Sequence, residues 1–370
     1  MSVKILHTAD LHIGMKFNGY PEPIRGKLQE ARIEVLARMI QRANEENCDL
    51  FVIAGDLFHN IKGIDKGTIA RTAEHLNGFL GECVLILPGN HDYDNDMIEL
   101  WEVFKKNASD KILLLKEETT VSLADYGLNV MVYPAPCRSK HSETNNIGWI
   151  RAEAIDPVMI NIGLAHGALQ GISPDMERSY FYMEHKELED LPVDLWLLGH
   201  THVPYPDSPS VKDWKIFNPG TPEPDGLDCR HEGHAWLITL NEEKSVRGEL
   251  IRTGLYRFKD LEYKAASGAD LDILRDALIG EGALETIARI RLAGRLTEDD
   301  FIYRQEIYKQ LEQELAYLLI DDSDLGIKIT PEKIEQEFTR GSFPSQFLNA
   351  LAEDEEALQI AYELIMGVKK

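Results

Sequence analysis

Polar residues that can bind a metal ion follow five short apolar runs in the first 202 residues of this sequence. The runs are Val3–His7, Leu50–Ala54, Val84–Leu87, Ile160–Ala165 and Leu195–Leu198. The polar residues after them are Asp10 and His12, Asp56, Asn90, His166, and His200 with His202. Any one of these groups alone is explained by a strand-end turn, but five in succession favour one shared site.

The side chains in these groups offer carboxylate, amide and imidazole ligands and no thiolate. That combination suits Mn²⁺, Fe²⁺ or Zn²⁺ better than Ca²⁺ or a structural zinc ion. Seven candidate ligands exceed the needs of one open catalytic metal. Two metals about 3.5–4 Å apart can share a bridging carboxylate, activate a water and stabilise charge on a phosphate. The ligand set therefore predicts a two-metal site for phosphoester hydrolysis.

The elements that must position these residues alternate between strands and helices. Each apolar run has the length of a strand and is too short for a typical helix. Helical spacing between the runs is seen at Ile33, Leu36, Ala37 and Ile40, and at Ile69, Ala73, Leu76 and Leu80. This alternation is typical of α/β folds, in which ligands collect outside the carboxyl ends of the strands. Five such ends in one sheet system would bring the distant residues together.

The sequence changes in character after about Tyr256, where a polar segment, an alternating run at 290–292 and helices with acidic faces follow. Thr297 is the expected N-cap of one helix, and Thr330-Pro331 places a cap and an N1 proline before another. The apolar stripe of the first helix is expected at Tyr308, Leu311, Leu315 and Leu318. A final helix is expected from about Pro344 and would include the acidic run 353–356 as a solvated face. We therefore expect a second, smaller domain.

The composition indicates a folded chain with an acidic surface. The 370 residues are 28% charged and 44% hydrophobic, enough for a large domain with a smaller attachment. The net charge of −24 repels polyanions at long range. The four cysteines include no Cys-x-x-Cys pair, and we expect reduced thiols. Because no secretory signal pattern or membrane-length apolar stretch is found, we expect a cytoplasmic protein with no membrane contact.

The polar groups occur in the order of the motifs of the calcineurin-like metallophosphoesterases, and the chain resembles that superfamily. The motifs are Asp10-x-His12, Gly55-Asp56, Gly89-Asn90-His91-Asp92, His166 and Gly199-His200-x-His202. The resemblance implies an α/β fold, a four-layer α-β-β-α sandwich. It implies that one metal is held by Asp10, His12 and His202, and the other by Asn90, His166 and His200. Asp56 would bridge the metals, and His91 would stabilise charge or protonate the leaving group.

Within that superfamily the chain looks most similar to the DNA-repair nucleases of the Mre11 and SbcD type, which include YhaO-like relatives. The finer match is Gly55-Asp56-Leu57-Phe58-His59, in which His59 occupies the place of a histidine that positions the DNA phosphate; a cap of its own loop is the alternative. This resemblance implies a Mn²⁺-dependent 3′-to-5′ exonuclease with endonuclease activity in DNA double-strand break repair.

The same resemblance implies a domain plan and partners. Residues 1–255 would form the nuclease domain, residues 256–340 a C-terminal α+β capping domain, and residues 341–370 a C-terminal helix for partner contact. The implied partners are DNA, an SbcC/Rad50-like ATPase and a second copy of the chain as a homodimer. The cofactors would be two divalent ions, with Mn²⁺ favoured over Fe²⁺ or Zn²⁺.

Three other functions stay open, one of them a plain metal-binding structural domain. A small-molecule phosphodiesterase or phosphatase would use the same ligands, and a noncatalytic regulatory subunit would keep the fold. The acidic charge is awkward for duplex DNA, because Lys and Arg contacts to phosphate supply most non-specific affinity. The candidates for a local basic rim, in expected loops near the ligands, are Lys16, Arg25, Lys27, Lys62 and Lys66.

Overall fold

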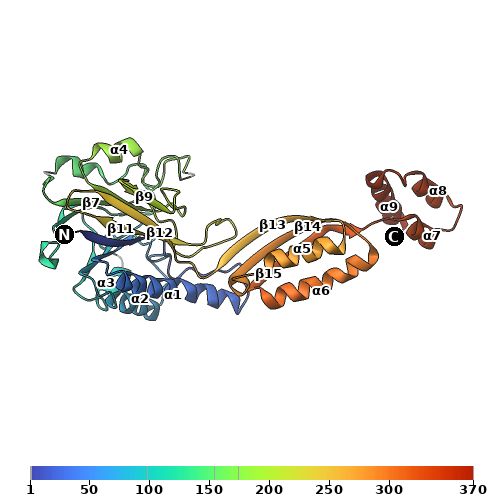
Figure 1. Cartoon of the computed structure of the whole chain (residues 1–370), viewed down its shortest axis with the longest axis horizontal. Helices are drawn as coiled ribbons and strands as arrows, with labels where there is room; N and C mark the ends of the chain where they lie inside the picture. Colours follow the sequence, from blue (N-terminus) through green and yellow to red (C-terminus); the bar gives the residue numbers. More distant parts are fainter. Residues whose placement is uncertain (1, 98, 154, 174, 370) are drawn as a thin grey trace. The chain divides into compact units, whose positions relative to one another are not determined.

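The structure is a computed structural model that describes residues 2–97, 99–153, 155–173 and 175–369 (Figure 1). The chain divides into two compact units, Met1–Phe258 and Lys259–Lys370. The division lies three residues after the predicted domain boundary at residue 255. Among the described residues, no helix combines the length and the apolar character needed to cross a membrane.

The first unit is built around two sheets. The larger sheet has the strand order β4 (Ile112–Leu114), β3 (Cys83–Leu87), β2 (Leu50–Ala54), β1 (Val3–Thr8), β11 (His234–Leu240), β12 (Val246–Arg252) and β9 (Ser210–Lys212). The smaller sheet has the order β10 (Ile216–Phe217), β8 (Leu195–Gly199), β7 (Ile160–His166), β6 (Val130–Ala135) and β5 (Val121–Ser122). Strands β1 to β4 are parallel, and so are β6, β7, β8 and β10. The carboxyl ends of the parallel strands therefore share one edge in each sheet.

Strand β2 shows how the layers are formed. Its Phe51 and Ile53 pack in a core with the helices, whereas Leu50 and Val52 pack in the core between the sheets. This alternation follows from successive side chains pointing to opposite faces of a strand.

Helices cover the outer face of each sheet (Figure 1). Those on the larger sheet are α1 (Ile24–Glu45), α2 (Lys66–Asn77) and α3 (Glu99–Lys105). The smaller sheet is covered by α4 (His185–Asp190) and the 3₁₀-helix η2 (Gly148–Ala152), and η1 (Ala124–Tyr126) is a further 3₁₀ turn of this unit. The predicted α/β class and four-layer α-β-β-α sandwich are confirmed.

The five predicted apolar runs form β1, β2, β3, β7 and β8, each with ends within one residue of the prediction. They are divided between the two sheets of the sandwich. The helical spacing is confirmed for both helices except at Leu80, whose side chain is 78% exposed. Leu80 faces solvent because α2 ends at Asn77, with Gly78 as its C-cap.

The second unit is an α+β structure with its own core. A sheet has the strand order β13 (Arg257–Ala265), β14 (Thr286–Leu296) and β15 (Tyr317–Ile327). Helices α5 (Gly268–Leu278) and α6 (Glu298–Glu314), with the 3₁₀-helix η3 (Ala283–Glu285) between them in sequence, pack on this sheet (Figure 1). The Thr297 hydroxyl accepts a hydrogen bond from Asp300 N at 3.2 Å, so the predicted cap of α6 is confirmed. Leu318 lies in β15 instead of the predicted stripe of α6.

The last helices share a separate small core. They are α7 (Pro331–Glu337), α8 (Phe343–Ala350) and α9 (Glu355–Lys369). Ile334 of α7 packs in one cluster with Leu348 of α8 and Leu358 of α9, so the predicted division at residue 340 cuts through this core. The expected single final helix is wrong. The carboxylate of Asp354 accepts a hydrogen bond from Ala357 N at 3.0 Å, which starts a new helix inside the acidic run.

Candidate metal centre

The structure brings all seven predicted ligands together at the carboxyl ends of five strands. Strands β1, β2 and β3 of the larger sheet are followed by Asp10 with His12, by Asp56 and by Asn90. Strand β7 of the smaller sheet ends on His166, and β8 is followed by His200 and His202. Because the two sheets are stacked with these ends on the same side, residues almost 200 positions apart become neighbours.

The first group contains Asp10, His12 and His202, whose possible ligand atoms lie within 4.8 Å of one another. The Nε2 atoms of His12 and His202 are 3.1 Å apart. Asp10 Oδ1 lies 3.9 Å from His12 Nε2 and 3.7 Å from His202 Nε2. One carboxylate oxygen and two imidazole nitrogens therefore face a common point.

The second group contains Asn90, His166 and His200. Asn90 Oδ1 lies 3.0 Å from His166 Nε2 and 3.0 Å from His200 Nδ1. The Nδ1–H of His166 donates to Ala54 O at 2.8 Å, which directs Nε2 toward the site. This arrangement leaves an amide oxygen and two ring nitrogens in close proximity.

Asp56 lies between the two groups. Its Oδ2 is 3.7 Å from His12 Nε2 and 3.4 Å from His166 Nε2, while its Oδ1 accepts a hydrogen bond from His91 N at 2.8 Å. A carboxylate that faces a nitrogen of each group is placed as a bridging ligand would be.

The buried donor set fits divalent cations. Asp10 Oδ1 is buried and has no hydrogen-bond partner among the described residues. A buried carboxylate oxygen without a donor costs free energy unless a positive charge compensates it. Oxygen and imidazole ligands around such an atom suit Mn²⁺, Fe²⁺ or Zn²⁺. The residues present are therefore compatible with two divalent ions.

Several of these residues have an uncommon backbone conformation. Positive φ angles are found at Asp10 (55°), His12 (49°), Asp56 (52°) and His200 (96°). Left-handed backbone is unfavourable for residues other than glycine, and such strain concentrates at functional sites. Gly55 has a φ of 95°, and a Cβ there would lie 2.0 Å from His166 Nδ1. Only glycine at this position leaves room for that imidazole.

Comparison with known proteins identifies the family. The family model described as Calcineurin-like phosphoesterase matches residues 3–204, a segment that contains all seven predicted ligands. The chain belongs to this family. This calcineurin-like phosphoesterase is 26% identical over 209 residues to the uncharacterized metallophosphoesterase YhaO of Bacillus subtilis (strain 168). The aligned segment covers 53% of this chain and 48% of YhaO. The chain thus spans about half the length of that curated relative.

Among solved structures, the crystal structure of TT1561 of Thermus thermophilus is similar to this phosphoesterase with a TM-score of 0.40 and 13% sequence identity. The match covers 68% of this chain and 100% of that one. The family description, phosphoesterase, names a class of enzymes that hydrolyse phosphoesters. The candidate ligand clusters of the structure agree with that class.

The charges of the centre are strongly coupled. Burial raises the pKa of Asp10 to about 6. Burial also opposes ionisation of Asp56, but the charge and hydrogen bond of His166 together with the charges of His12 and His91 outweigh it and lower the pKa of Asp56 below its ordinary range. Burial alone would lower the pKa of His166, but the charge and hydrogen bond of Asp56 contribute to raising it to about 9. Without metal, Asp56 and His166 are therefore an ion pair, and a cation would replace the proton on His166 Nε2.

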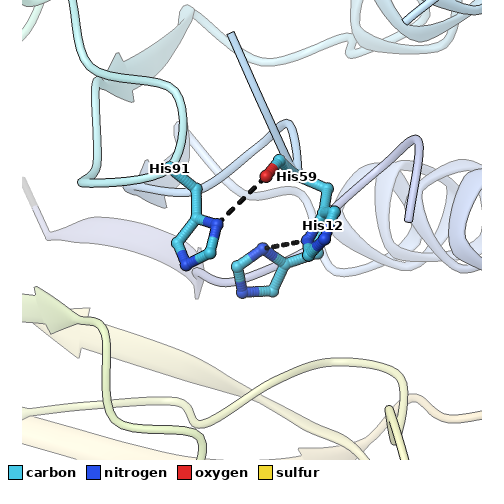
Figure 2. Close-up of side chains that lie close together, drawn as sticks. All are labelled: His12, His59 and His91. Atoms are coloured by element: carbon cyan, nitrogen blue, oxygen red, sulfur yellow. Dashed lines mark hydrogen bonds between the residues drawn. The ribbon is translucent and has the colours of Figure 1, made fainter. Parts of the chain in front are cut away.

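His59 and His91 lie beside His12 in a cluster of three imidazoles (Figure 2). The Nδ1–H of His91 donates to the main-chain oxygen of His59 at 3.0 Å. The Nδ1 atoms of His59 and His12 are 3.4 Å apart, and the rings of His59 and His91 are stacked with centroids 5.3 Å apart. Both residues predicted to act on the substrate are thus next to the phosphoesterase's first ligand group.

Two contacts to the ligands, and one to the residue between two of them, had no counterpart in the sequence motifs. Asp225 Oδ2 accepts a hydrogen bond from His202 Nδ1 at 2.7 Å. The Tyr180 ring stacks on His200 with centroids 5.2 Å apart. The buried Arg32 donates to Leu11 O at 2.9 Å. None of these residues stands at a fixed spacing from a ligand, so the sequence offered no signal for them.

The expected basic rim is wrong in part. Arg25 and Lys27 lie in α1 and Lys66 begins α2, so these three residues are not in loops. Arg25 pairs with Glu22 and Lys66 with Glu99. The positive charges of Arg25 and Lys66 are therefore partly neutralised.

Proposed function

We propose that this phosphoesterase is a two-metal phosphodiesterase that acts on DNA, as a Mn²⁺-dependent 3′-to-5′ exonuclease with endonuclease activity. The observation that carries the proposal is the pair His59 and His91, which lies against the ligand cluster without being part of the two ligand groups. The resemblance of segment 55–59 to nucleases of the Mre11 and SbcD type supports DNA as the substrate.

The chain's own residues divide the work of such a reaction. In the proposal, Asp10, His12 and His202 would hold one ion, Asn90, His166 and His200 would hold the other, and Asp56 would be shared between them. Ions held there would supply an activated water and would neutralise charge on the phosphate oxygens.

His91 is proposed to serve the leaving group. Its Nδ1–H is already committed to His59 O, so Nε2 is the atom that would give a proton to the departing oxygen. The main-chain contact from His91 N to Asp56 Oδ1 keeps the imidazole next to the proposed bridging carboxylate.

His59 is proposed to contact the DNA phosphate. If His12 binds a metal through Nε2, its Nδ1 carries the proton and donates to His59 Nδ1. His59 then keeps its own proton on Nε2, which is free to donate to a phosphate oxygen.

The test is DNA cleavage by the purified chain with Mn²⁺. End-labelled double-stranded DNA and a chromogenic diester are incubated in parallel, with and without chelator, and Asp56→Asn serves as the inactive control. We expect cleavage of both substrates that the chelator abolishes. Hydrolysis of the diester without any DNA cleavage would contradict the proposed substrate.

A small diester is the second candidate, and the cleft beside His200 and His202 favours it. The cleft has a volume of about 1350 Å³ and carries four aspartates but only two arginines, Arg230 and Arg252. Arg252 is paired with Glu232 at 3.2 Å. An acidic cleft repels a long polyanion more than a compact diester. A salt titration of both activities therefore separates the two candidates. Cleavage of DNA should fall steeply with added salt if Lys and Arg contacts to phosphate bind the DNA.

A further inference from the structure

The segment that carries His202 is held by the loop that follows β10. Asn218 Nδ2 donates to Thr201 O at 2.6 Å and to Val203 O at 2.7 Å. The His231 ring donates from Nε2 to the main-chain oxygen of His202. Because the carbonyls of three successive residues are taken by this loop, the backbone at His202 has a fixed orientation.

The same loop supplies a carboxylate to the imidazole of His202. Asp225 Oδ2 lies 2.7 Å from His202 Nδ1, which requires the proton on Nδ1. Nε2 then presents its lone pair toward His12 Nε2 at 3.1 Å and Asp10 Oδ1 at 3.7 Å. Asp225 therefore selects the tautomer of His202 that can bind a cation through Nε2.

A buried arginine fixes the position of this loop. Arg32 of α1 is 1% exposed; its Nη1 donates to Leu11 O at 2.9 Å and its Nη2 to Pro224 O at 3.4 Å. Leu11 lies between two predicted ligands, and Pro224 directly precedes Asp225. One guanidinium thus links the first ligand segment to the residue next to the carboxylate. The loop lies outside the segment 3–204 that the family model matches.

We propose that Asp225 is a positioning residue of the metal centre, which orients His202 so that the ion held by Asp10, His12 and His202 binds tightly. The inference rests on the proposed metal centre and concerns only one of its two ions. Carboxylates that hold a metal-binding imidazole typically contribute about 10–100-fold to metal affinity. The loss in an Asp225 variant should therefore be confined to one ion.

The experiment is a titration of the metal-free full chain with Co²⁺, followed by its visible absorption and by metal analysis after dialysis. The wild-type chain should bind two ions. Asp225→Ala should weaken one ion by about 10–100-fold and leave the other unchanged. Asp225→Asn, which keeps an acceptor oxygen but not the charge, should lose less, about tenfold. Asp228→Asn changes an exposed carboxylate of the same loop and should keep both affinities.

A second measurement reports the tautomer directly. In ¹⁵N spectra of the metal-free chain, His202 should carry its proton on Nδ1 in the wild type and lose this preference in Asp225→Ala. Circular dichroism establishes that each variant is folded. If Asp225→Ala is unfolded, the metal affinities of the isosteric Asp225→Asn variant test the inference.

Wild-type affinity for both ions in the folded Asp225 variants would overturn the inference, and so would equal weakening of both ions, which indicates a general distortion. The titration contains no phosphoester. A wild-type chain that binds two ions but cleaves neither DNA nor the diester would refute the proposed function while leaving the role of Asp225 intact.

Discussion

The imidazoles of His59 and His12 face each other through their Nδ1 atoms at 3.4 Å (Figure 2). Burial lowers the pKa of His59 to about 4, so this ring is neutral near pH 7 and can accept a hydrogen bond at Nδ1. The contact joins a proposed substrate residue to a proposed ligand. His59 can therefore act on the phosphate, on the orientation of His12, or on both.

Replacement of His59 separates these roles. His59→Ala should reduce cleavage of duplex DNA more than hydrolysis of a chromogenic diester, because placement matters most for a large, constrained substrate. Rates on both substrates and metal content are the measurements. Equal losses on both substrates would deny a DNA-specific role, and loss of one ion would indicate that His59 acts through His12.

Asp56 should be the most sensitive ligand position. Asp56→Ala removes the carboxylate between both groups, so it should release both ions and lower hydrolysis by more than about 10³-fold, since several kcal/mol of charge stabilisation are lost. His12→Ala should chiefly disturb one ion. Metal analysis of both variants checks this, and two tightly held ions in Asp56→Ala would refute the bridging assignment.

His91 should matter for turnover and not for metal. His91→Ala should keep both ions and lower the rate by about 10²–10⁴-fold, the usual contribution of a positioned proton donor. Metal content, DNA binding and steady-state kinetics are measured together. If the variant loses an ion, His91 is a ligand and the proposed role is wrong.

Substitution of Gly55 tests whether the His166 imidazole needs the space left by the missing Cβ. In Gly55→Ala the new Cβ would lie 2.0 Å from His166 Nδ1, so the ring must move and one ion should be lost. Gly63→Ala is a matched control, because Gly63 also has a positive φ of 82° but no atom within 4 Å of the new Cβ. Both variants carry backbone strain, and only Gly55→Ala should change metal content. Equal metal content in the two would contradict the packing argument.

His7 should make the metal-free chain sensitive to acid. Burial lowers the pKa of His7 to about 3, and His7 Nε2 donates to Leu198 O at 3.0 Å. In the unfolded chain His7 takes up a proton near pH 6.5, whereas in the folded chain it does so only near pH 3. The contribution of neutral His7 to the free energy of unfolding is therefore complete above pH 6.5 and is lost as the pH falls from 6.5 toward 3. At pH 5 this residue should cost about 2 kcal/mol of unfolding free energy relative to pH 7.

Urea denaturation of chelator-treated protein at pH 7 and pH 5 measures that loss. His7→Gln keeps an amide donor and should be less sensitive to pH. Part of the sensitivity should remain, because burial also lowers the pKa of His200 to about 3. An unchanged difference between the two pH values in His7→Gln would contradict the assignment.

The sequence by itself determined the strands and the chemical types of the predicted ligands. Short apolar runs such as 50–54 can be buried on both faces only in a sheet covered on both sides, and this local pattern marks the strand ends where Asp56 and Asn90 stand. The cap at Thr297 is equally local, because its hydroxyl serves a main-chain amide three residues away. Properties that depend on near neighbours in the chain were therefore predictable.

Only the tertiary structure decided how the ligands are distributed between the two sheets and which residues hold each ligand in place. Asp225 meets His202 across 23 positions, and Arg32 reaches Pro224 across 192. No periodicity or spacing encodes such pairs, because they arise where segments distant in the chain are packed together. The acidic run 353–356 shows the same limit: its pattern suits a helix face, but the hydrogen bond of Asp354 to Ala357 N makes it a helix start.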